Sequence, residues 1–153
     1  RKIIRHQVNS FFELLPVSPL NPMWGEKNDW LPEKGLKLAD LSAAIVVEEH
    51  SFQLRPGGIP AFIEACNSSG SEALSIMDGR TIGAFMSMIG TLHNVRLWWW
   101  FEDLSEREAR VDLLSSDLKW LAFVEKLKPL LVEQSSMLMM PRPISEMSPL
   151  FNG

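Results

Sequence analysis

The segment Gly83–Arg107, GAFMSMIGTLHNVRLWWWFEDLSER, constrains the fold more than any other part of this chain. Two strongly apolar runs, Thr81–Ile89 and Leu92–Phe101, are separated only by Gly90-Thr91, which is the spacing of a β-hairpin. The second run contains three consecutive tryptophans and leads directly into a helix-start signal. We therefore predict two antiparallel strands that feed a helix.

The helix-start signal is Ser105-Glu106-Arg107-Glu108, which matches a capping box. In such a box the Ser105 hydroxyl accepts from the Glu108 amide while the Glu108 carboxylate reaches back, so we expect a helix to start at Ser105. A second helical stretch should follow, limited by Pro129. Its apolar residues at helical spacing are Trp120, Phe123, Val124, Leu127 and Leu131. A last strand is expected over about Val132–Met140, ending at Pro141.

The segment before the hairpin predicts one strand and one helix. The strand should run from Ile45 to about Leu54 and end at Arg55-Pro56-Gly57-Gly58. The helix should begin near Gly58, because Ile59, Phe62, Ile63 and Cys66 form one apolar stripe. The order from residue 45 is strand, helix, strand, strand, helix, strand. This order predicts an α+β fold, a ferredoxin-like βαββαβ unit with an antiparallel sheet.

The strands are apolar on both faces, whereas two helices can cover only one face. A second sheet is the usual solution, so we expect a dimeric α+β barrel, formed by a homodimer or a pseudo-dimer. Residues 1–44 differ in texture from residues 45–153 and are interpreted as an N-terminal extension or linker. Within them, Gln7–Leu15 could be the last strand of a preceding repeat, and Trp24–Lys37 resembles a loop.

Composition excludes several classes of protein. Fifteen Lys+Arg against nineteen Asp+Glu give a net charge of −4, which argues against a nucleic-acid surface. No apolar run approaches the roughly 20 residues of a transmembrane segment. The single Cys66 cannot form an internal disulfide, which favours a reducing compartment, so we expect a cytoplasmic protein, or a mitochondrial one if the source is eukaryotic.

The sequence assigns no catalytic residue. It contains no Gly-rich phosphate loop, GxSxG, HExxH or paired CxxC motif, and its three histidines lack metal-ligand spacing. We therefore expect no metal site, and no cofactor is required. The candidates for a ligand pocket are Glu48, His50, His93, Arg96 and Trp99.

Each candidate has a structural alternative. Glu48 and His50 share a strand face and could form a proton-relay dyad, or simply a solvated or interface ion pair. His93 could ligate haem or act as a base in a cavity between sheets, or could be a surface residue. Trp99 should share a face with Leu97 and Phe101, and Arg96 should share the other with Trp98 and Trp100, with an Arg96–Trp98 cation–π contact. Core packing and dimer contact explain the tryptophans without a ligand.

Four blocks in order give the chain a resemblance to the NIPSNAP family of dimeric α+β barrel proteins. They are EEHSFQLRPG at Glu48–Gly57, IGAFMSMIG at Ile82–Gly90, LWWWFEDLSERE at Leu97–Glu108 and VEQSSMLMMPRPISEMSPL at Val132–Leu150. The chain departs from the family pattern at three places, with Phe52 and Phe101 where members carry Tyr and Leu97 where they commonly carry His.

The resemblance implies two functional hypotheses. Eukaryotic members are associated with mitochondria and with vesicle- or autophagy-related binding, which implies a non-enzymatic binding or scaffold protein that acts as a dimer with a protein partner. The wider superfamily includes cofactor-free monooxygenases and haem-degrading enzymes, which implies a small-molecule monooxygenase-type enzyme, cofactor-free or haem-dependent, using a cavity between the sheets. The missing Tyr and His favour the first hypothesis. A pocket above about 300 Å³ into which His50, His93 and Arg96 converge would favour the second.

Overall fold

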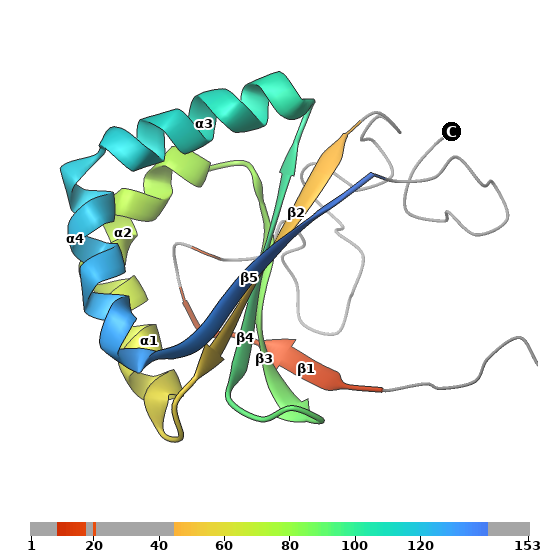
Figure 1. Cartoon of the computed structure of the whole chain (residues 1–153), viewed down its shortest axis with the longest axis vertical. Helices are drawn as coiled ribbons and strands as arrows, with labels where there is room; N and C mark the ends of the chain where they lie inside the picture. The colour runs from red at the N-terminus through yellow and green to blue at the C-terminus, as the bar shows by residue number, and fades with distance from the viewer. Residues whose placement is uncertain (1–8, 18–19, 21–44, 141–153) are drawn as a thin grey trace, which may run out of the picture.

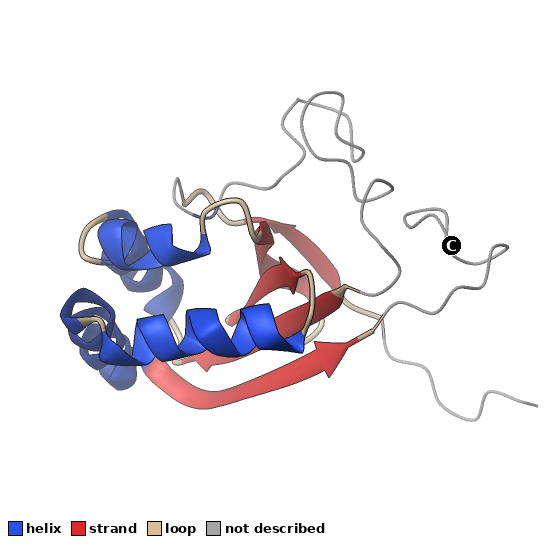
Figure 2. Ribbon diagram, turned by 90° about the horizontal axis from the view of Figure 1, so that it is seen from above, coloured by secondary structure: helices blue, strands red, loops and turns tan. Residues whose placement is uncertain are grey.

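A computed structural model of the chain describes residues 9–17, residue 20 and residues 45–140. Their five strands form one antiparallel sheet in the order β1-β3-β4-β2-β5. The strands are β1 (Phe11–Leu14), β2 (Val46–Leu54), β3 (Thr81–Ile89), β4 (Asn94–Phe101) and β5 (Leu131–Met139). The helices all lie on one face of the sheet (Figures 1 and 2). They are α1 (Gly58–Asn67), α2 (Gly70–Ala73), η3 (Leu74–Met77), α3 (Leu104–Ser116), α4 (Leu118–Leu127) and η4 (Lys128–Leu130).

This arrangement confirms the predicted α+β class and the βαββαβ order from residue 45. The strand order β5-β2-β4-β3 is that of a ferredoxin-like sheet, in which the first and third strands of the unit are central. The predicted N-terminal strand is present as β1, and it extends this same sheet by pairing antiparallel with β3. The predicted loop Trp24–Lys37 and the tail after Met140 lie outside the described residues.

Alternation along the strands divides the core between the two sheet faces, as predicted for the three tryptophans. On the helix side, Leu97, Trp99 and Phe101 belong to the main core with Phe62 of α1 and Phe123 of α4. On the open face, Trp100 packs in a smaller cluster. The other members of this cluster are Ile45, Val47, Ile82, Trp98 and Met139.

The open face is only partly apolar, and this corrects our expectation of a uniformly apolar face. Most of its apolar half is already buried within the chain: Ile45 is 2% exposed and Trp100 is 3% exposed. The Arg80 guanidinium lies 4.2 Å from the Trp100 ring centroid and helps to cover it. The other half of the face carries polar side chains. Within the described strands, the exposed large apolar residues lie in the two edge regions of the sheet, namely Phe11, Leu14, Met88, Ile89, Val132, Met137 and Leu138.

Helix α3 starts earlier than the capping-box pattern predicted. Its N-cap is Asp103, whose carboxylate accepts from the Glu106 amide at 2.8 Å, while the Glu106 carboxylate accepts from the Glu102 amide at 2.8 Å. Ser105 therefore lies in the first turn, and the predicted cap is wrong by two residues. Asp103 is the residue with extended backbone after β4, which is the conformation that an N-cap requires.

Two other boundaries differ from the predictions. The hairpin turn runs through residue 93, because His93 has φ 59° and β4 begins only at Asn94. Leu131 opens β5 opposite Leu54 and does not belong to the preceding helix, which ends at Leu127 before the Pro129 turn.

Candidate functional site

The helix-side face of the sheet holds a buried ionic cluster centred on Glu48, which is 1% exposed. Arg107 of α3 donates two hydrogen bonds to this carboxylate, from Nε at 2.9 Å and from Nη2 at 2.7 Å. The His50 ring nitrogen Nε2 lies 2.9 Å from Oε1 of the same carboxylate. The structure thus brings together Glu48 and His50, as their spacing on one strand predicted, and adds Arg107 from 59 positions along the chain.

The charges of this cluster fix the ionisation of Glu48. Burial alone raises the pKa of the Glu48 carboxyl, but the hydrogen bonds and charges of His50 and Arg107 outweigh burial and lower the pKa to about 2. In return, the hydrogen bonds that Arg107 donates to the Glu48 carboxylate raise the pKa of Arg107. Because Glu48 is the carboxylate that accepts both hydrogen bonds from Arg107, removing Glu48 leaves the Arg107 charge without its counter-charge.

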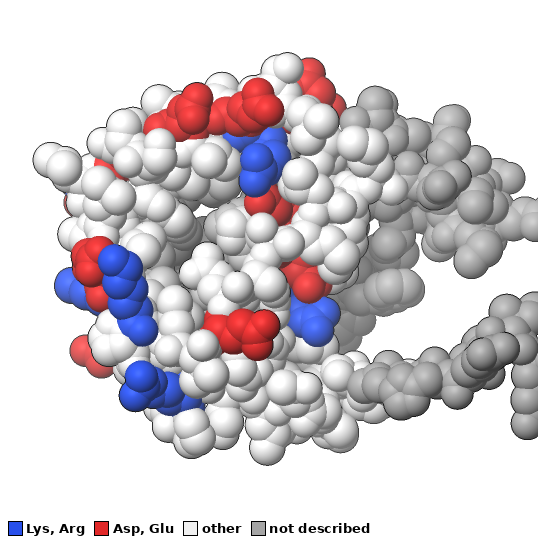
Figure 3. Space-filling model, in the orientation of Figure 1, with Lys and Arg blue, Asp and Glu red and all other residues white. Residues whose placement is uncertain are grey.

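A cavity of about 200 Å³ lies beside this cluster, between α3, α4 and the sheet, and we call it the helix-side cavity. Figure 3 shows the hollow between α3 and β5 on this side of the molecule. Its polar wall is formed by Glu48, His50 and Arg107, and Trp99 lies edge-on to His50 with ring centroids 4.8 Å apart. The remaining lining residues are Met77, Val111, Leu114, Ser115, Trp120 and Ser136. Three of the five predicted residues therefore converge here.

Arg96 lies on the opposite face of the sheet and cannot join them. Its Nη1 lies 3.3 Å from the Glu49 carboxylate, which also accepts from the Trp98 indole at 2.7 Å. The Arg96 guanidinium stacks on Phe12, 4.7 Å from the ring centroid, so the cation–π contact involves Phe12 in place of the predicted Trp98. Glu49 thus links Arg96 and Trp98.

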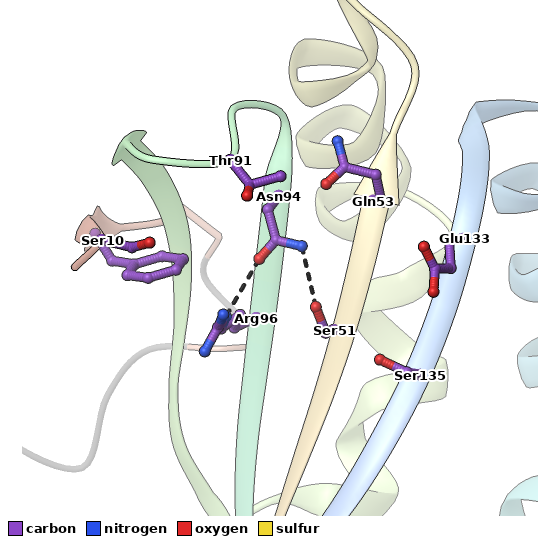
Figure 4. Close-up of a pocket in the computed structure, with 9 residues that line it drawn as sticks. Ser10, Ser51, Gln53, Thr91, Asn94, Arg96, Glu133 and Ser135 are labelled. Atoms are coloured by element: carbon purple, nitrogen blue, oxygen red, sulfur yellow. Dashed lines mark hydrogen bonds between the residues drawn. The ribbon is translucent and has the colours of Figure 1, made fainter. Parts of the chain in front are cut away.

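A second hollow, of about 220 Å³, lies beside Arg96 on the open face, and we call it the sheet-face pocket (Figure 4). Asn94 lies at its centre, where the side-chain Nδ2 donates to Ser51 Oγ at 3.0 Å and Oδ1 accepts from Arg96 Nε at 3.2 Å. The other lining residues are Ser10, Phe12, Gln53, Thr91, Glu133 and Ser135.

The remaining candidate, His93, lines neither hollow. It lies in the hairpin turn with a positive φ, just before β4 begins, so the alternation of side chains along β4 does not place it on either face of the sheet. Across the described part of the chain, no three His, Cys, Asp or Glu side chains gather as they would around a metal ion. Within the same residues, no helix has the length and apolar character needed to cross a membrane.

The residues of the helix-side cavity do not fit haem. The cavity is smaller than the roughly 300 Å³ at which pockets for drug-sized ligands begin. The His50 nitrogen Nε2 is already engaged by Glu48. We therefore derive no chemistry through haem.

Comparisons with known proteins agree with this architecture. The model of the NIPSNAP family matches residues 47–146. "Protein NipSnap homolog 3A" from Homo sapiens is 28% identical over 100 residues, which are 65% of this chain and 40% of that protein, so the chain spans less than half the length of this relative.

Solved structures of bacterial proteins show the same similarity. A NIPSNAP-like domain protein from Burkholderia xenovorans has 31% identity and a TM-score of 0.62, covering 67% of this chain and 89% of its own. A NIPSNAP family protein of unknown function from Agrobacterium tumefaciens has 29% identity and a TM-score of 0.63, covering 71% of this chain and 95% of its own. The family match, the fold and the ordered sequence blocks lead to one conclusion: this chain belongs to the NIPSNAP family.

Proposed function

We propose that this domain is a non-enzymatic binding or scaffold protein that acts as a dimer, or as a pseudo-dimer with another repeat, through the β5 edge of its sheet. The observation that carries the proposal is the position of β5 at the edge of the sheet. Among the described strands, β5 pairs only with β2, so its other edge has backbone groups without a strand partner. Free strand edges are templates for pairing with another chain.

The side chains of β5 support the same interpretation. Met137 is 52% exposed, Leu138 is 47% exposed and Val132 is 65% exposed. A soluble edge strand is usually protected by charges, proline or a bulge, whereas Leu131–Met139 has a single charged residue, Glu133, and its one register irregularity lies at its start, between Leu131 and Glu133. Pairing with a second strand would bury these apolar side chains and satisfy the free backbone groups together.

The opposite edge provides an example of this mode of binding within the chain. Strand β1 is distant in sequence from the βαββαβ unit and adds to β3 as an extra antiparallel strand. Its interpretation as the last strand of a preceding repeat remains a proposal. If β1 is the last strand of a preceding repeat, then β5 would add in the same way to the edge strand of the next sheet. The two sheets would then close the predicted barrel.

The test is the mass of the intact chain in solution, measured by light scattering at micromolar concentration. We expect a dimer for the parent protein and a monomer for Met137→Lys, because a lysine on an edge strand opposes edge pairing. Leu118→Lys is the matched control, since Leu118 is 80% exposed on α4 and distant from the edge, and it should remain dimeric. A monomeric parent protein, or equal masses for both variants, would refute the proposal.

A second candidate function is small-molecule chemistry of the monooxygenase type. The specific observation in its favour is the Glu48–His50 pair at the wall of the helix-side cavity, since a carboxylate that orients a histidine is a common arrangement for moving a proton. The candidate would work on the helix side of the sheet and not between two sheets, because His50 and Arg96 face opposite sides. Neither hollow lined by the predicted residues reaches about 300 Å³, and this favours the binding function.

Substrate turnover would separate the two candidates. A small aromatic substrate oxidised by the parent protein and not by His50→Phe would establish the enzyme and replace the binding proposal. Cellular compartment and protein partner remain predictions from the sequence.

A further inference from the structure

The open face of the sheet carries an ordered patch of polar side chains. The strand register places Arg96, Ser51 and Ser135 in one row across β4, β2 and β5, and places Asn94, Gln53 and Glu133 in the next row. Side chains two positions apart on a strand share a face, so all six point to the same side. The rows nearer the other end of these strands are mostly apolar: Trp98 and Met137 flank Glu49 of β2, and Trp100 and Met139 flank Val47.

These six side chains line the sheet-face pocket, whose volume is about 220 Å³. At ~30 Å³ per water molecule, this is room for about seven waters. A ligand that replaced them would have the size of a single sugar ring or its open-chain equivalent. Nonpolar ligands are excluded by the wall, because Phe12 is the one apolar side chain that lines it.

The central side chains are fixed before any ligand arrives. Asn94 is 8% exposed and is hydrogen-bonded on both sides, to Ser51 and to Arg96 (Figure 4). Arg96 is further held by Glu49 and by the ring of Phe12. Gln53 Nε2 donates to the Leu92 carbonyl at 2.8 Å, which fixes its amide and leaves Oε1 as an acceptor. Side chains ordered in advance lose little entropy on binding.

The two ends of the pocket have opposite hydrogen-bonding character. Arg96, at one side in Figure 4, can only donate hydrogen bonds, and the carboxylate oxygens of Glu133, at the other side, accept them. An anion would face the Glu133 carboxylate, and a cation would face the Arg96 guanidinium. Hydroxyl groups donate and accept, so a molecule with several of them satisfies both ends and the serine and threonine hydroxyls between them.

We propose that the sheet-face pocket binds a small, neutral, polyhydroxylated molecule of single-sugar size. This inference goes beyond the proposed partner binding, because the pocket is built from one chain. Failure of the dimer would show in the mass of the protein, and failure of the pocket would show in a ligand titration, so the two are distinguishable.

The test is a titration of the full chain, labelled with ¹⁵N, observed by NMR through the side-chain amide signals of Asn94 and Gln53. The probes are D-glucose, D-ribose, D-mannitol and myo-inositol, each added to about 50 mM, since binding of only about 4 kcal/mol gives a millimolar Kd. We expect at least one probe to shift both signals along a saturable curve. If none of the four does so, the proposal is overturned.

Two neighbouring substitutions on β5 provide a matched pair. Ser135→Leu would fill the pocket and should weaken binding about tenfold or more, a loss of about 1.4 kcal/mol. Gln134→Leu lies on the opposite face of the same exposed strand and lines neither hollow, so it should change the Kd less than about twofold, as expected for a surface substitution. Glu133→Leu removes the acceptor end and should also weaken binding about tenfold. Binding that survives Ser135→Leu and Glu133→Leu unchanged would overturn the assignment.

Discussion

Replacing Glu48 with glutamine should remove the part of the pH dependence of stability that comes from the buried cluster. The pKa of Glu48 is lowered from 4.5 to about 2 in the folded protein by His50 and Arg107. At about 1.4 kcal/mol per pKa unit, this depression corresponds to roughly 3 kcal/mol of stability. Because the folded pKa is the lower one, this contribution is present above pH ~4.5 and is lost as the pH falls toward ~2.

The assay is urea unfolding of the parent protein and of Glu48→Gln at a series of pH values from neutral down to about pH 2. We expect Glu48→Gln to be less stable at neutral pH by about 3–5 kcal/mol, the cost of leaving Arg107 without its counter-charge. The difference between the two proteins should shrink by roughly 3 kcal/mol as the pH falls to about 2, where the parent carboxyl also becomes protonated.

Glu125→Gln is the matched control, because Glu125 is an exposed carboxylate that pairs with Lys128 on the surface of α4. Its unfolding free energy should stay within about 0.5 kcal/mol of the parent value at every pH. A constant difference between the parent protein and Glu48→Gln from neutral to acid pH would refute the reasoning, since it would mean that the carboxyl does not titrate with a lowered pKa.

Three further predictions concern the fold. Because Asp103 caps α3, Asp103→Ala should lower the free energy of unfolding in urea by about 1 kcal/mol, and Ser105→Ala by less than about 0.5 kcal/mol. A larger effect at Ser105 than at Asp103 would contradict this assignment. Gly70→Ala should cost about 1–3 kcal/mol, because an added Cβ would lie 2.7 Å from Phe123 Cε2, while the exposed neighbour Ser71→Ala should be nearly neutral. Burial raises the pKa of the Cys66 thiol to about 12. A thiol reagent at mildly alkaline pH should therefore modify Cys66 only after urea unfolds the protein. Rapid modification of the folded protein would contradict this, because it would show that the thiol is accessible.

Patterns that depend on neighbouring residues were predicted well. The alternation of Leu97–Phe101 placed Trp99 on one face of the sheet and Trp98 and Trp100 on the other, because side chains alternate strictly in a regular strand. The same rule placed Glu48 and His50 together. The order of apolar segments was enough to identify the βαββαβ unit.

Features that depend on tertiary contacts were not predicted. Arg107 belongs to a helix segment whose charges indicate only a solvated face, and its contact with Glu48 follows from how α3 crosses the sheet. Asp103 and Ser105 are both good N-cap residues, and the choice between them depends on where β4 ends. For His93, the Gly90-Thr91 spacing suggested a two-residue turn, whereas the actual turn extends through His93.

The most direct test of the proposed binding function is hydrogen exchange along β5, measured on the full chain at concentrations above and below the dissociation constant of the dimer. In an antiparallel pair, alternate amides of an edge strand point away from its only neighbour, so half of the β5 amides point away from β2. We predict that these outward amides are protected at high concentration and exchange freely after dilution, while the amides bonded to β2 stay protected at both. Outward amides that exchange equally fast at every concentration would contradict the claim that this edge binds a partner.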